Sequence, residues 1–112
     1  MAEKSVEEEI YRLHAELCSV LSHPKRLKIL NLLRDGEKSV KKLLTKIKTN
    51  KANLSQHLTV LRKQKIVSTR REGLNIYYRL TYPKMIKACD IIREVLFEQL
   101  KENNLLLKRY KK

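Results

Sequence analysis

Leucines recur every three or four residues between Lys51 and Lys63, and short polar side chains fill the positions between them. Leu54, Leu58 and Leu61 have the spacing of one buried helix face, and Asn50 is suited to cap the first turn. On the other faces, amide, hydroxyl and ammonium groups match the base edges and phosphates of a DNA major groove. We therefore interpret residues 51–63 as a recognition helix that presents Lys51, Ala52, Asn53, Ser55, Gln56 and Thr59.

The charge of the chain is concentrated around this helix. Its 112 residues carry a formal net charge of +14. Residues 23–81 hold sixteen Lys and Arg against three acids, whereas residues 1–22 hold two against five and residues 82–112 eight against four. This asymmetry predicts a polyanionic partner, namely nucleic acid. The alternative is a solvated lysine-rich surface of the kind that thermophile proteins carry.

Two helices are expected before residue 36. Residues 6–22 carry apolar side chains at helical spacing, and Ser5 with Glu8 resembles a capping box. Pro24 suits the first position of a second, largely apolar helix, which we expect to be central and buried. Gly36 is suited to end it in a left-handed conformation.

A third, shorter helix is expected after Ser39, which is suited to cap it, and carries Val40, Leu43, Leu44 and Ile47. A tight turn over residues 45–50 then leads into the recognition helix. Two short helices joined in this way, the second polar on its outer face, form a helix-turn-helix pattern.

The periodicity changes after Lys65. Residues 66–71 and 76–81 alternate and are rich in Val, Ile, Thr and Tyr, which is typical of strands. Residues 72–75 would form the hairpin tip. Arg70 and Arg71 lie at the approach to this tip, where a β-wing can meet the phosphate backbone or the minor groove.

A long apolar helix is expected from Pro83 to about residue 106, and the basic residues 108–112 after it should be frayed and solvated. This helix is too long for a small core to cover, so we expect it and the first helix, over about residues 6–22, to pack against a second subunit. The predicted fold is mainly α with a β-hairpin wing. It is a single winged helix-turn-helix domain over residues 1–112, in the order α-α-α-α-β-β-α.

Several classes of protein are not expected. There is no apolar run long enough to span a membrane, no signal-peptide pattern, and two cysteines do not make a disulfide scaffold. We expect a cytoplasmic protein. The absence of a nucleophile–base pair and of a glycine-rich phosphate loop argues against an enzyme.

Three ordered segments resemble the ArsR/SmtB family of repressors, over roughly residues 14–96. Residues 21–30 (LSHPKRLKIL) resemble the second-helix signature of that family, and residues 53–61 (NLSQHLTVL) its recognition helix. Arg71-Glu72-Gly73, followed by residues 77–80 (YYRL), resembles its wing. The resemblance implies a homodimer on an imperfect inverted repeat in double-stranded DNA, which represses transcription until an inducer, often a metal or metalloid, releases it.

The resemblance also assigns residues to the operator. It implies that Asn53, Ser55, Gln56 and His57 face DNA, with Asn53 and Gln56 on base edges. His57 has an alternative role in packing the recognition helix against its neighbours, and Lys51 suits phosphate contact. The family often has a basic residue after the wing glycine, whereas this chain has Leu74. Wing contacts would therefore depend on Arg70 and Arg71.

The metal sites of the family are not matched. The positions of its arsenic-type thiolates correspond to Ser39 and Lys41. The positions of its zinc-type ligands correspond to Tyr82, Lys84, Val95 and Glu98. Neither set should bind metal, so no cofactor is expected.

Other residues leave three alternatives open for sensing. His14 and Cys18 share a helix face. With Cys89 and Asp90 they could bind zinc or another thiophilic ion. Cys18 and Cys89 could instead respond to oxidants or polysulfides by forming a bridge, or both could simply pack. The alternative to a specific repressor is a nucleoid protein that binds DNA by charge; Asn53 and Gln56 argue against it.

Overall fold

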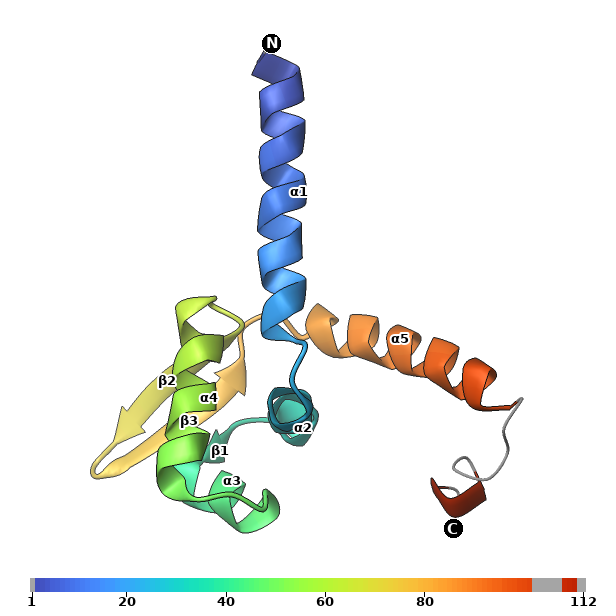
Figure 1. The fold of residues 1–112 in the computed structure, drawn as a ribbon. Coiled ribbons are helices and arrows are strands. Elements are labelled where there is room, and N and C mark those ends of the chain that lie inside the picture. The colour runs from blue at the N-terminus through green and yellow to red at the C-terminus, as the bar shows by residue number, and fades with distance from the viewer. Residues whose placement is uncertain (1, 102–107, 111–112) are drawn as a thin grey trace. The chain divides into compact units, whose positions relative to one another are not determined.

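The computed structural model describes residues 2–101 and 108–110, and it has a winged helix-turn-helix fold (Figure 1). The chain divides into two compact units, Met1–Tyr82 and Pro83–Lys112. The first unit contains α1 (Ala2–Val20), α2 (Pro24–Leu32), the 3-10 turn η1 (Leu33–Asp35), β1 (Lys38–Ser39), α3 (Val40–Lys46), α4 (Lys51–Lys63), β2 (Val67–Glu72) and β3 (Asn75–Leu80). The second contains α5 (Lys84–Leu100).

The core of the first unit lies where α2, α3 and α4 meet the small sheet. Each helix contributes buried apolar side chains, and the sheet contributes Val67 at the start of β2 and Tyr78 from the middle of β3. Burial of such side chains stabilises a fold by about 1.5–3 kcal/mol each. The buried side chains include Ile29, Leu30, Leu33, Leu43, Ile47, Leu54, Leu58, Leu61, Ile66, Val67 and Tyr78.

Helix α1 differs from its predicted start. It begins at Ala2 rather than Val6, so Ser5 and Glu8 lie inside the helix and the predicted capping box is wrong. Ala2, Glu3 and Lys4 extend the helix toward the N-terminus because all three have good helix propensity. Every side chain from Ser5 to Glu16 is exposed, including the apolar Ile10 and Leu13.

The helix starts in the helix-turn-helix region follow their predicted signals. Pro24 occupies the first turn of α2, and the His23 ring accepts a hydrogen bond from the Lys25 backbone N–H. The hydroxyl of Ser39 accepts from Lys42 N–H at 3.1 Å, and the amide oxygen of Asn50 accepts from Asn53 N–H at 2.7 Å. These caps fix where α3 and α4 begin.

Helix α2 is only partly as predicted, because Ile29 and Leu30 are buried whereas Leu27 is exposed. The α-helix ends at Leu32, and η1 continues the chain to Gly36. Gly36 has φ +137°, a region that favours glycine.

The sheet is antiparallel with strand order β1-β3-β2. The strands of the wing are each shifted by one residue from the predicted bounds, so the tip is the two-residue turn Gly73-Leu74 between paired Glu72 and Asn75. Gly73 adopts φ +62° there. The short strand β1, which the sequence did not predict, pairs Ser39 with Tyr77.

In the second unit, α5 begins after Pro83 and ends at Leu100. The expected extension over residues 102–106 lies outside the described residues, as do residues 111–112 of the predicted solvated tail. Residues 108–110 are helical and exposed, and the Tyr110 ring lies 5.4 Å from that of Phe97. The helix exposes Ile91, Ile92, Val95 and Leu96.

Among the described helices, none has the combined length and hydropathy that would let it cross a membrane.

Candidate nucleic-acid interface

Helix α4 has one buried and one exposed side. Leu54, Leu58 and Leu61 are buried on the first. A helix turns by about 100° per residue, so Ser55, Gln56 and Thr59 lie on the side away from these leucines. The side chains of Lys51, Ser55 and Gln56 are exposed, and those of Asn53 and Thr59 are half-buried. The exposed side therefore offers donors and acceptors in a short row that begins at the helix N-terminus.

His57 does not belong to this exposed row. Its side chain is 8% exposed, and its ring centroid lies 4.4 Å from that of His23 at the start of α2. Burial lowers the pKa of His57, and the nearby His23, Arg26 and Lys25 lower it further. A neutral, buried imidazole suits packing between α4 and α2, so the geometry favours the second of the two predicted roles.

The two arginines of β2 have different surroundings. Arg70 donates to Glu37 and to Glu72, and its guanidinium carbon lies 4.5 Å from the centroid of the Tyr77 ring. Arg71 is exposed and makes no ion pair with any residue that the structure describes. Of these two, Arg71 is therefore the guanidinium that is available to an external phosphate.

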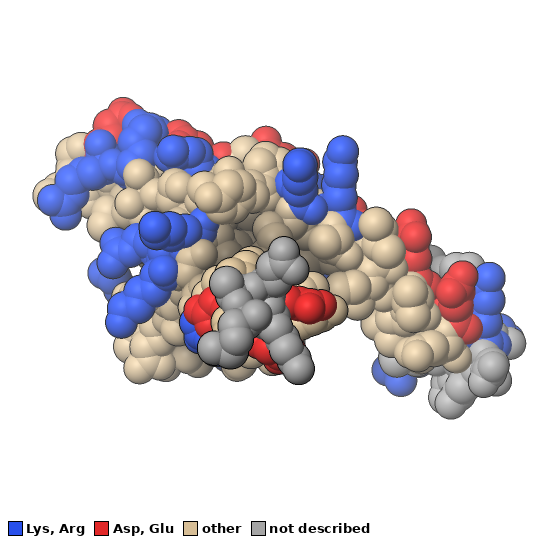
Figure 2. All heavy atoms as spheres, turned by 90° about the horizontal axis from the view of Figure 1, so that it is seen from above, with Lys and Arg blue, Asp and Glu red and all other residues tan. Residues whose placement is uncertain are grey.

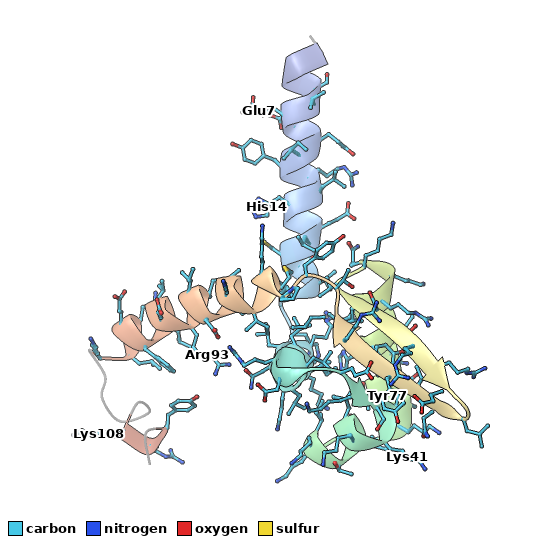
Figure 3. The ribbon with its side chains drawn as sticks, turned by 180° about the vertical axis from the view of Figure 1, so that it is seen from behind. Glu7, His14, Lys41, Tyr77, Arg93 and Lys108 are labelled. Atoms are coloured by element: carbon cyan, nitrogen blue, oxygen red, sulfur yellow. The ribbon has the colours of Figure 1, made fainter. Side chains whose placement is uncertain are left out.

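The exposed row of α4 lies among basic side chains. Figure 2 shows many Lys and Arg side chains gathered at the left of the view, where the first unit holds α4 and the wing (Figure 1). Lys41 projects from α3 into solvent (Figure 3), and Lys42, Lys46 and Lys48 nearby in the chain are also exposed. The Lys25 ammonium lies 3.4 Å from the Thr49 hydroxyl, just before α4. These charges can attract a polyanion to the start of the recognition helix.

The predicted sensor residues are divided between the two units. His14 and Cys18 lie on exposed positions of α1, and His14 points away from the helix into solvent (Figure 3). Cys89 and Asp90 lie on α5, and both cysteines are thiols. Within the described part of either unit, no three His, Cys, Asp or Glu side chains gather as a metal site requires. The metal, thiol and packing alternatives thus stay predictions.

A short helix-turn-helix, a two-stranded wing and a polar recognition face define the winged helix-turn-helix class of regulatory proteins. The sequence model of the family described as "Bacterial regulatory protein, arsR family" matches residues 23–69. The chain is 36% identical over 101 residues to the HTH-type transcriptional regulator Rv0081 of Mycobacterium tuberculosis, covering 89% of each protein. The chain belongs to the ArsR family, whose members are transcriptional regulators.

Two further relatives extend this comparison, and the Rv0081 structure supports it. The crystal structure of Rv0081 matches with a TM-score of 0.76, covering 84% of this chain and 95% of that one. The biofilm growth-associated repressor of Xylella fastidiosa is 40% identical over 88 residues, covering 79% of this chain and 77% of that protein. The homodimeric winged helix-turn-helix DNA-binding domain Mb0332 of Mycobacterium bovis is 28% identical with a TM-score of 0.75, covering 86% and 89%.

Sequence reasoning missed the partners of Arg70. Glu37 lies 33 positions earlier and before a two-residue strand, so no local pattern indicates that the two side chains meet. The wing register could have indicated Tyr77, because Arg70 and Tyr77 are directly paired across the hairpin.

Proposed function

We propose that the chain is a homodimeric, sequence-specific repressor that binds an inverted-repeat operator in double-stranded DNA. The observation that carries the proposal is the exposed polar row of α4, which lies on the side away from a buried leucine stripe and begins at a capped N-terminus. A protein that bound DNA by charge alone would not need the side-chain amides of Asn53 and Gln56 in this row. Members of the family regulate bacterial genes, so we place the protein in the cytoplasm.

The row divides into two chemical roles. Gln56 and Asn53 carry amides that can bond an adenine edge bidentately, so we assign them to base readout. Lys51, Ser55 and Thr59 supply an ammonium and two hydroxyls, which suit phosphates at the groove edge. Arg71 supplies the same sequence-independent contact from the wing.

A homodimer would give two such helices. The exposed apolar side chains of α1 and α5 are the surface we assign to a second copy, because exposed stripes of this kind are typical of interaction sites. The relative Mb0332 is a homodimer. Two recognition helices in successive major grooves would read half-sites about 34–36 Å apart.

An inducer would release the proposed repressor from its operator. We propose thiol chemistry at Cys18 and Cys89 ahead of a metal, because the inherited ligand positions hold residues such as Lys41 and Lys84. Operator complexes should be titrated with zinc, peroxide and polysulfide. Release by polysulfide or peroxide that Cys89→Ser abolishes would support the thiol switch. Release by zinc alone would favour a site with His14, Cys18, Cys89 and Asp90, whereas no release would leave both cysteines as packing residues.

DNA specificity is tested by selecting duplexes from a randomised pool with the purified protein. An inverted repeat should emerge and should bind at least about 1000-fold more tightly than random duplex. A salt titration on both duplexes separates readout from charge. Enrichment of no sequence, with equal affinity for all duplexes, would contradict the proposal and favour the nucleoid alternative.

A further inference from the structure

Arg70 on β2 joins the wing to a segment that precedes the helix-turn-helix. Its Nε donates to Glu37 Oε2 at 3.2 Å, and its Nη2 donates to Glu37 Oε1. Glu37 lies just before β1, 33 positions earlier in the chain. Two parallel bonds between a guanidinium and one carboxylate fix the angle as well as the distance between them.

Two further contacts use the rest of the guanidinium. Its Nη1 donates to Glu72 near the end of the same strand. The face of the group stacks on Tyr77, 4.5 Å from the ring centroid. Tyr77 pairs with Arg70 on one side and with Ser39 on the other. Ser39 also caps α3, so Tyr77 connects Arg70 of the wing to the start of the first helix of the helix-turn-helix.

The charges around Arg70 argue against a phosphate contact. All three of its nitrogens donate to carboxylates. Glu37 and Glu72 together outweigh its single positive charge, so the Arg70 guanidinium offers no net attraction to an approaching phosphate. The hydrogen bond from Arg70, aided by the charge of Arg79, holds the pKa of Glu37 below its usual range, so Glu37 stays ionised at neutral pH.

We infer that Arg70 is a positioning residue, which holds the wing at a fixed orientation to the helix-turn-helix through Glu37 and Tyr77. The inference rests on the proposed function. Arg71 follows Arg70 directly and points to the other face of the strand. The wing thus divides its adjacent arginines between two tasks, with Arg70 directed to the protein and Arg71 to the DNA.

A double-mutant cycle tests this inference. Arg70→Gln, Glu37→Gln and the double variant are titrated against the selected operator duplex at several salt concentrations. Each single variant should weaken operator binding by about two- to fivefold, since exposed networks contribute up to about this much. The double variant should bind the operator no more weakly than the weaker-binding single variant, because both single substitutions break the same Arg70–Glu37 ion pair. The slope of log affinity against log salt should not change.

If Arg70 contacted a phosphate instead, the same substitutions would change the salt slope and the affinity differently. Arg70→Gln would then reduce the salt slope by about 0.9, and Glu37→Gln would tighten binding by freeing the guanidinium. Either result overturns the inference, as would wild-type binding by all three variants. The matched control is the cycle of Arg12→Gln and Glu9→Gln on α1, an exposed pair of the same chemistry that should leave operator binding unchanged.

The Arg70–Glu37 ion pair can also be tested without DNA. The Glu37 carboxyl should titrate at higher pH in Arg70→Gln than in the wild type, as followed by NMR. If the wild type selects no operator but this shift is present, the proposed function is contradicted while the Arg70–Glu37 ion pair is supported. If Glu37 titrated at the same pH in Arg70→Gln as in the wild type, the Arg70–Glu37 ion pair itself would be contradicted.

Discussion

The imidazole rings of His23 and His57 lie 4.4 Å apart between centroids and are tilted by 53°. His23 caps α2, and its Nδ1 accepts the Lys25 backbone N–H at 3.2 Å. His57 comes from the buried side of the recognition helix. The pair therefore joins the start of α2 to the middle of α4, and the neutral form of His57 suits this contact because Lys25 and Arg26 are close by.

Stability should fall in mildly acidic solution because of His57. Its pKa in the folded state is lowered from 6.5, chiefly by burial. The unfolded chain therefore binds a proton at higher pH than the folded chain, and the free energy of unfolding decreases as the pH falls below about 6.5. Urea unfolding between pH 8 and pH 5 measures this dependence.

His57→Gln should reduce that pH dependence, whatever its effect on stability at pH 8. His14→Gln is the control, since His14 is exposed on α1. An equal dependence in the wild type and His57→Gln would contradict the assignment. The lowered pKa values of Glu9 and Glu37 act in a separate window, below about pH 4.5.

Gln56→Ala should weaken operator binding by about 1–3 kcal/mol and relax specificity at one base pair, because the amide would no longer bond a base edge. Binding to a panel of single-substitution operators measures both effects. Gln64→Ala makes the same change at the C-terminal end of α4 and should bind as the wild type does. An equal loss of affinity for random duplex would refute base readout by Gln56.

Arg71→Ala should weaken binding to every duplex and reduce the salt slope by about 0.9, because one phosphate contact is lost. Fluorescence anisotropy over a range of salt concentrations measures the slope. Arg12→Ala also removes one positive charge, from an ion-paired position on α1, and should leave the slope unchanged. A slope that does not respond to Arg71→Ala would show that the wing does not contact phosphates through this residue.

Local signals made the helix-turn-helix predictable. Asn50 and Ser39 have short acceptor side chains followed by helical stripes, and both cap the helices expected of them. The leucines of α4 are buried because their spacing leaves them on one side. The resemblance to the ArsR family rested on the same segments.

Non-local contacts could not be predicted in this way. Strand β1 has two residues, too few for a periodic pattern, and it forms because β3 offers an open edge. The Arg70–Glu37 pair depends on that strand placement. The capping signal at Ser5 failed because the good helix formers Ala2, Glu3 and Lys4 before it continue the helix. The environment of His57 required knowledge of what packs against α4.

Dimer formation should depend on the apolar side chains of α5. Ile92 is 68% exposed in the single chain, beside Ile91, Val95 and Leu96. Ile92→Asp would bury a carboxylate in the proposed interface without a partner, which is strongly unfavourable. Sedimentation velocity should therefore show a monomer, and operator affinity should fall because the two half-sites would no longer be bound together. Lys87→Gln on the same helix makes the same change in net charge at a polar exposed position, and it should stay dimeric. A dimer that survives Ile92→Asp would place the interface elsewhere on the chain.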